Sequence, residues 1–339
     1  MKYSRRNRSK IYRYNRSKNV GGKRSTKNRG KNRGNSAKQE ITTITGLQKM
    51  NCNPRVKGRT VSTDTCFTED ALSKIKTAYN KNHRKNAITA TDPKEIWTEL
   101  RQRLTTCSKE DCWLEQIKET HVRRQLDEIL FAPDHPKEWM KKPNAWLSNF
   151  DIAAVLRQYE ESHPHFKLLG PSSIDYDSKP SELGGQCVWP DLCRLSMREL
   201  LNRGKTQWGI SFNLDEYSEP GSHWVSMFVD VPNKIIYYYD SALNPMPKEV
   251  KRLQKEIIKQ GKNLDQPVEF KCYKNRHTHQ RTTSECGMYS LFFIITFLTG
   301  ETEEQKNMEI QHKIDLFSNK NIPDAAVRKY RTMYFNQPV

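Results

Sequence analysis

The chain has 339 residues, of which 35% are hydrophobic, and it carries a net charge of +19. This length suits one large domain with a smaller attached region. The charge is local, because residues 1–38 hold 15 Lys or Arg and no acidic residue, which leaves +4 for the other 301 residues. No apolar run follows these charges and none elsewhere approaches the roughly 20 residues of a membrane span, so we expect neither a secretory signal nor a membrane partner.

The first 40 residues are predicted to be a disordered basic tail. Their Arg, Lys, Asn, Ser and Gly cannot bury enough apolar surface to offset the entropy of ordering. Fifteen cations, with Tyr3, Tyr12 and Tyr14 available to stack on bases, also suit non-specific binding of DNA or RNA through residues 1–40. A localisation signal or a solubilising tail would have the same composition.

Residues 41–140 are predicted to form a helical arm region. Asp92-Pro93 is a good helix start, with an N-cap followed by proline in the first turn. An apolar spacing near 3.6 then runs from Ile117 to Leu130. A proline-containing break at residues 132–136 separates this region from a catalytic domain that we assign to residues 141–339.

The rest of the chain alternates predicted helices and strands, which indicates an α+β fold. Helices are expected at 146–159, 196–203, 247–259 and 286–298, and strands at 208–214, 224–231, 234–239 and 268–273. Residues 170–190 are expected to be a loop. Pro232-Asn233 separates two of the strands, which therefore form a hairpin.

The eight cysteines are expected to be mostly reduced, buried and inert. The pairs Cys107 with Cys112 and Cys187 with Cys193 lack the regular spacing of a zinc site, and no nearby histidine completes one. We therefore expect no metal and no cofactor.

Cys286 is the predicted nucleophile. It lies where a polar loop meets an apolar helix, and a helix N-terminus favours the thiolate. Gly287 lets a substrate backbone come close, and the first-turn N–H groups are free to donate. Gln280 offers a neutral donor of the kind used to stabilise a developing oxyanion.

His223 is the predicted base and Asp240 the group that orients it. His223 precedes the first strand of the hairpin and Asp240 ends the second, so antiparallel pairing makes them neighbours. Each residue alone has a plainer explanation as a surface, turn or packing residue. The alternatives left open are Asn244 as the orienting group, His277 or His279 as the base, Cys272 as a packing residue, and Trp146 and Trp224 as core aromatics.

These residues resemble the family of SUMO proteases and adenovirus proteinases. His223-Trp224 opens a strand, Asp240-Ser241 follows 17 residues on, and Gln280 stands six residues before Cys286-Gly287. Trp146-Leu147-Ser148-Asn149 is similar to the family's Trp-Leu-Asn-Asp motif. The resemblance implies a papain-like cysteine protease core, a central mixed sheet flanked by helices. It also implies that Trp146 and Trp224 clamp a Gly-Gly segment and that Asn149 and Gly287 contact the substrate.

Two departures from the family pattern are visible. Glu285 replaces the usual Asp before Cys-Gly, and Asn149 stands where an acid is common. The helical arm, the basic terminus and the closing residues 328–335 look most like core-polyprotein proteases of large nucleocytoplasmic DNA viruses. The resemblance thus implies an endopeptidase that cleaves viral precursors after Gly-Gly, in the host cytoplasm and the virion. The alternatives are an isopeptidase for ubiquitin-like modifiers and a nucleic-acid-binding virion protein, for which the basic tail also allows the nucleus.

Overall fold

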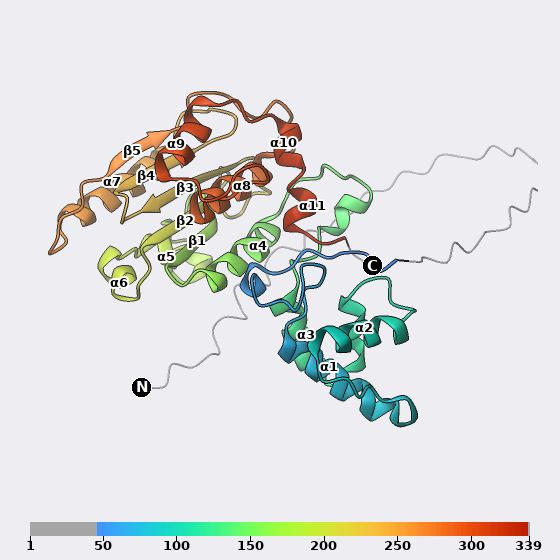
Figure 1. Cartoon of the computed structure of the whole chain (residues 1–339). Coiled ribbons are helices and arrows are strands. Elements are labelled where there is room, and N and C mark those ends of the chain that lie inside the picture. The colour runs from blue at the N-terminus through green and yellow to red at the C-terminus, as the bar shows by residue number, and fades with distance from the viewer. Residues whose placement is uncertain (1–45, 338–339) are drawn as a thin grey trace, which may run out of the picture. The chain divides into compact units, whose positions relative to one another are not determined.

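The computed structural model describes residues 46–337, so the predicted tail lies outside the described residues. Its helices and strands follow the chain as drawn in Figure 1. The predicted helical arm region holds α1 (Glu69–Asn82), α2 (Pro93–Arg103), α3 (Thr120–Leu130) and four short 3-10 helices, η3 (Pro54–Val56), η4 (Arg84–Asn86), η5 (Asp111–Gln116) and η6 (Lys137–Met140).

A hydrophobic core within residues 50–131 stabilises this helical region. Phe67, Trp113 and Leu72 lie at its centre, and Phe67 stacks on Trp113 at a centroid distance of 5.3 Å. The predicted helix start is confirmed, because the Asp92 side chain accepts from the backbone N–H of Lys94 at 2.9 Å. The apolar contacts within this region therefore belong to a core of its own.

The second region is built on a five-stranded mixed sheet, as the resemblance implies. The strands lie in the order β1 (Phe166–Ser173), β2 (Gln207–Asn213), β3 (Trp224–Asp230), β4 (Ile235–Tyr239) and β5 (Lys271–Lys274). The two outer pairs are parallel and the two inner pairs are antiparallel. The remaining elements are α4 (Asn149–Ser162), η7 (Ser181–Leu183), α5 (Pro190–Cys193), α6 (Met197–Asn202), α7 (Lys248–Lys262), α8 (Cys286–Thr299), α9 (Ile310–Asn319), α10 (Asp324–Arg328) and α11 (Arg331–Tyr334).

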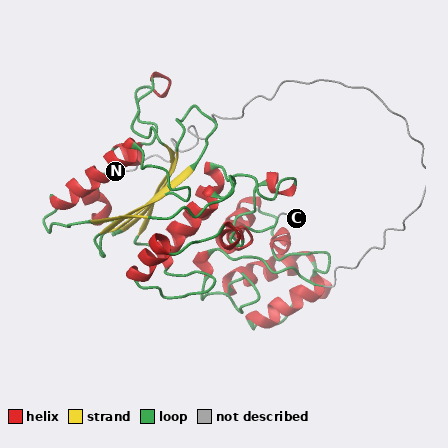
Figure 2. Ribbon diagram, turned by 90° about the horizontal axis from the view of Figure 1, so that it is seen from above, coloured by secondary structure: helices red, strands yellow, loops and turns green. Residues whose placement is uncertain are grey.

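Strand β3 is buried along its whole length because both faces of the sheet are covered. Trp224 and Phe228 face the core that contains α4 and α8, whereas Val225 and Met227 face the core that contains α6 and α7. This alternation is the period of two of a β-strand. Figure 2 shows the sheet between helices on both sides.

Helix α8 is the central helix of one face. Its residues 286–298 are all buried. Gly209 lets it approach β2, since a Cβ there would come within 2.7 Å of the Ile294 side chain. Within residues 46–337, no helix combines the length and apolarity needed to cross a lipid bilayer.

Three expectations about elements need correction. Residues 166–173 form a strand instead of leading into a loop at 170. Helix α7 continues through Gly261 to Lys262, because Gly261 is buried against Phe270 and takes part in the helix. Strand β5 covers Lys271–Lys274 and not 268–273.

The expectation of mostly reduced thiols is also wrong. The structure pairs Cys52 with Cys66, Cys107 with Cys112 and Cys187 with Cys193, and leaves Cys272 and Cys286 free. The Cα atoms of the three pairs are 5.1, 5.6 and 6.3 Å apart. These separations lie within the range that a disulfide spans.

Candidate active site

Cys286 is the first residue of α8, as predicted from the change from polar to apolar sequence. It is 2% exposed, and Glu285 precedes it as the N-cap residue. The first-turn N–H groups of a helix have no partner within the helix, and they place partial positive charge around the thiol. This environment can receive a developing oxyanion.

His223 and Asp240 are neighbours at the end of the β3–β4 hairpin. The register pairs Ser226 with Tyr239, which brings the residues beyond each strand end together. Nε2 of His223 lies 2.6 Å from Oδ1 of Asp240. The Asp240 carboxylate also accepts from the backbone N–H groups of Ala242 and Asn244, each at 2.9 Å, so its orientation is fixed.

Cys286 also interacts with the His223 ring and contributes to the pKa of His223. Since Nε2 faces Asp240, Nδ1 is the nitrogen left for the sulfur. Burial lowers the pKa of His223, but the hydrogen bonds and charges of Asp240 and Cys286 outweigh it and raise the pKa to about 9. Near neutral pH the ring is therefore an imidazolium between the Asp240 carboxylate and the Cys286 sulfur, which places an acid beside the atom that would attack.

Gln280 lies beside this group on the loop before α8. Its Oε1 accepts from the Ser241 hydroxyl at 2.7 Å, and its Nε2 donates to the carbonyl of Thr282. An amide has two N–H donors, so one remains for a ligand. The buried Asp324 carboxylate accepts from the backbone N–H of Thr282 at 2.8 Å and so holds the loop.

The four residues expected to contact substrate differ in exposure. Trp146 is 48% exposed, whereas Trp224 is 5% exposed and donates from Nε1 to the Leu147 carbonyl at 3.0 Å. Asn149 is the exposed first residue of α4. Gly287 is buried, and a Cβ there would come within 3.0 Å of Leu147, so helix packing already requires a glycine.

The alternative residues are not placed for catalysis. His279 is fully buried against Tyr239, whose hydroxyl lies 3.1 Å from Nδ1, and burial lowers its pKa to about 4. His277 is exposed, and Asn244 meets Asp240 only through its backbone. Cys272, expected to pack in the core or at an edge, lies exposed on the edge strand β5, which excludes the core.

Sequence reasoning missed a buried ion pair beside the nucleophile. Glu285 is fully buried, and its carboxylate contacts Arg331 of α11 at 2.9 Å and Arg328 at 3.3 Å. In the sequence, Glu285 in place of the family's usual Asp indicated only that the negative charge is kept. Nothing in the spacing identifies a partner 46 residues further on.

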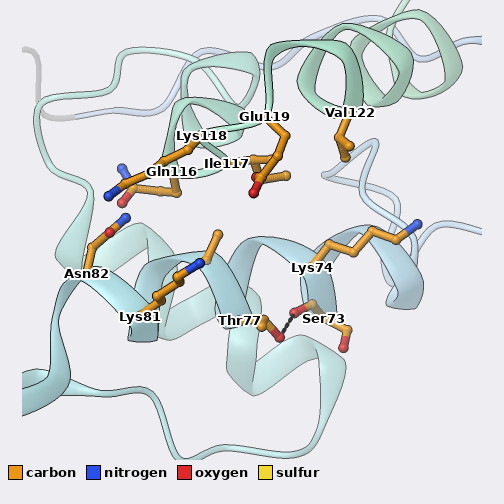
Figure 3. A pocket seen from close by; sticks show the side chains of 11 residues that line it. Ser73, Lys74, Thr77, Lys81, Asn82, Gln116, Ile117, Lys118, Glu119 and Val122 are labelled. Carbon is orange, nitrogen blue, oxygen red and sulfur yellow. Dashed lines mark hydrogen bonds between the residues drawn. The ribbon is translucent and has the colours of Figure 1, made fainter.

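A separate cleft lies in the helical arm region. It has a volume of about 340 Å³ and lies between α1 and residues 116–122, with Lys74, Lys81 and Lys118 at its rim (Figure 3). None of the predicted catalytic or substrate-contacting residues lines it. Its location does not suggest a part in the Cys286 chemistry.

Comparison with known proteins gives the same class of enzyme as the geometry. Residues 210–334 match the family model described as the Ulp1 protease family, C-terminal catalytic domain. The chain is 28% identical over 299 residues to a protein of Acanthamoeba polyphaga mimivirus that is provisionally named a thiol protease, covering 81% of this chain and 90% of that one. It is 26% identical over 257 residues to a cysteine protease of African swine fever virus, covering 71% of this chain and 88% of that one.

A solved structure supports the fold. The crystal structure of an African swine fever virus protease matches with a TM-score of 0.56 and 20% identity, covering 86% of this chain and 98% of that chain. The match extends beyond residues 210–334, which the family model covers, into the helical region before them.

Proposed function

Because the chain is a cysteine protease with a Ulp1-type catalytic domain, we propose that it is an endopeptidase that cleaves viral structural polyprotein precursors after Gly-Gly. The observation that carries the thiol-protease chemistry is the hydrogen-bonded pair of His223 and Asp240 beside Cys286 at a helix N-terminus. The proposed Gly-Gly selectivity is supported separately, by the position of Trp146 and Trp224. Precursors of this kind place the activity in the host cytoplasm and the virion.

The reaction we propose has two halves, formation of an acyl-enzyme on Cys286 and its hydrolysis. The Cys286 thiolate attacks the scissile carbonyl carbon, and the oxyanion accepts from the free Gln280 N–H and from backbone N–H at the start of α8. The His223 imidazolium then gives its proton to the leaving amine as the C–N bond breaks. Neutral His223 next takes a proton from water, whose oxygen attacks the acyl-enzyme and releases the thiolate.

Gly-Gly selectivity is proposed to come from Trp146 and Trp224. Trp224 is tied to the Leu147 carbonyl, and Trp146 precedes Leu147 with almost half of its surface exposed. We propose that an extended substrate passes close to the exposed Trp146 ring, where a side chain would collide with the ring. Glycine has no side chain and can pass. Ala-Ala-X peptides should therefore be cleaved much more slowly than Gly-Gly-X peptides.

The test is hydrolysis of matched Gly-Gly-X and Ala-Ala-X peptides by the full chain. Cys286→Ala should abolish cleavage with folding intact, whereas Cys272→Ala, which removes the other free thiol, should leave it near the wild-type rate. Full activity in Cys286→Ala would refute the assigned nucleophile. Equal rates for the two peptides would refute the substrate slot that we propose between Trp146 and Trp224, and would leave the nucleophile in place.

A second candidate is an isopeptidase for ubiquitin-like modifiers. It is favoured by the name of a relative from another isolate of African swine fever virus, a SUMO-1 cysteine protease that is 25% identical to this chain. The same chemistry serves both functions, so the substrate must decide. Release of a ubiquitin-like protein from a lysine conjugate, without cleavage of Gly-Gly-X peptides, would favour this candidate.

Residues 1–40 are proposed to bind DNA or RNA without sequence preference. The support is their charge, with fifteen cations and no acid before Glu40. Affinity for duplex DNA should fall by roughly 0.9 log units per log unit of salt for each phosphate neutralised. Deletion of residues 1–40 should remove this dependence on salt. An unchanged salt slope would show that the tail is not the segment that binds nucleic acid.

A further inference from the structure

Arg331 lies in α11, near the end of the chain, yet its side chain is only 5% exposed. Its Nε donates to Oε2 of Glu285 at 3.0 Å, and Nη2 lies 2.9 Å from the same oxygen. Nη2 also donates to the Ser284 carbonyl at 3.3 Å. One edge of the guanidinium is thus bound to the two residues that precede Cys286.

The other edge holds the segment that leads to Trp146. Nη1 donates to the carbonyls of Pro143 and Ala145, at 3.2 and 3.1 Å. The guanidinium carbon lies 4.2 Å from the ring centroid of Trp139, whose Nε1 donates to the same Ala145 carbonyl at 2.9 Å. A guanidinium has five N–H donors, and Arg331 makes four hydrogen bonds through its three nitrogens.

The segment held in this way lies directly against the nucleophile helix. Ala145 precedes Trp146, and Leu147 both accepts from Trp224 Nε1 at 3.0 Å and packs against Gly287. Residues 143–147 therefore form the contact between the slot and the first turn of α8. A shift of this segment moves Trp146 relative to Cys286, whereas none of the Arg331 contacts involves His223 or Asp240.

We propose that Arg331 is a positioning residue for the protease: its guanidinium clamps residues 143–145 to residues 284–285, which fixes the spacing between the substrate slot and the nucleophile. The proposal rests on the proposed function for its substrate. Lysine cannot replace this arginine, because an ammonium has three donors and no planar fork. A positive charge alone is therefore not enough to hold residues 143–145 against residues 284–285.

The test must separate positioning from simple loss of fold. Arg331→Met alone would leave the buried Glu285 carboxylate with only Arg328, so it is paired with Glu285→Gln, whose amide oxygen still accepts from Arg328. Arg331→Lys tests charge without the fork. The matched control is Arg252→Met, which removes an arginine of α7 that pairs with Asp177 and lies outside the site.

Three measurements are compared in the full chain: kcat/KM for a Gly-Gly-X peptide, alkylation of Cys286 by iodoacetamide, and deuterium exchange of residues 143–148. In E285Q/R331M and in R331K, peptide kcat/KM should fall on the order of 10²-fold, as a misplacement of about 1 Å can cause. Alkylation should stay close to wild type, because this small reagent needs no slot. Exchange should rise in residues 143–148 and stay unchanged elsewhere, and R252M should match wild type in all three.

Each other outcome counts against the clamp. If cleavage and alkylation fall in parallel and deuterium exchange rises throughout the chain, Arg331 only stabilises the fold. Wild-type cleavage in R331K would show that charge suffices, and unchanged exchange in residues 143–148 would overturn the proposal. If the wild-type chain cleaves no Gly-Gly peptide, the proposed substrate fails, and the exchange of residues 143–148 alone then decides the role of Arg331.

Discussion

Replacing Asp240 by Asn should move the alkaline limit of activity to lower pH. Burial alone would lower the pKa of His223, and the contacts of Asp240 and Cys286 reverse this and raise it to about 9. The rise above 6.5 corresponds to about 3 kcal/mol, at roughly 1.36 kcal/mol per pKa unit. The His223 side chain is 15% exposed, so solvent screens little of this energy. Both Asp240 and Cys286 contribute to this energy, so replacing Asp240 should remove only part of the rise in the pKa of His223.

The expected shift of the alkaline limb of kcat/KM is about 1 to 2 pH units, within the roughly 1 to 3 units that one opposite charge in contact produces. This limb reports loss of the His223 proton, because the imidazolium is the acid that protonates the leaving amine. Turnover should fall but exceed that of Cys286→Ala, since the substitution disturbs only orientation and charge. The matched control is Asp177→Asn, which breaks a surface pair with Arg252.

The same shift predicts how stability depends on pH. Since the folded pKa lies above the unfolded value, protonation of His223 stabilises the fold fully below about pH 6.5, and this contribution is lost as pH rises through about 9. Urea unfolding on either side of this window should show the loss in wild type and a smaller loss in Asp240→Asn. An alkaline limb that does not move, with equal stability slopes in both proteins, would refute the assigned charge state.

Three further predictions follow from the site and the disulfides. Gln280→Ala should lower kcat on the order of 10²- to 10³-fold as one oxyanion donor is lost, and a change in KM alone would contradict that role. Trp146→Ala should raise KM for Gly-Gly peptides in steady-state assays while Tm stays constant, because the ring is 48% exposed; unchanged KM would remove Trp146 from the slot. Opening the disulfide between Cys52 and Cys66, which are 14 residues apart, by Cys→Ser at both positions should cost about 3 kcal/mol in urea unfolding, and no change would show the thiols to be unpaired.

The catalytic hairpin was predictable because its determinants are local. Alternating apolar residues and the Pro232-Asn233 break define two strands, and the antiparallel pairing places His223 beside Asp240 without further information. The start of α8 was predictable for a similar reason, a sharp change from polar to apolar residues at Cys286. The catalytic roles of these residues stay predictions until the variants are measured.

The features that sequence reasoning missed depend on contacts between distant segments. Strand β1 contains Gly170-Pro171, which reads as a turn, yet its neighbours Leu168 and Leu169 pair with β2. The disulfides depend on which thiols the tertiary fold brings together, whereas the expectation of reduced cysteines rested on chain length and on the lack of a secretory signal in the sequence. Arg331 shares no periodic pattern with the segment 143–145 that it binds.

This difference has a consequence for how the enzyme can vary. The thiol, its base and the orienting carboxylate lie on α8 and at the ends of β3 and β4, which the central core holds rigid, so the bond-breaking chemistry tolerates change elsewhere. The slot instead depends on residues 139–147, which are fixed mainly by Arg331, by Trp139 and by the Leu147 contact with Trp224. Substitutions in this peripheral segment should alter which substrates enter while leaving the reactivity of the thiol intact. If Trp146 limits which substrates enter, the comparison of peptide cleavage with alkylation measures selectivity and thiol reactivity separately.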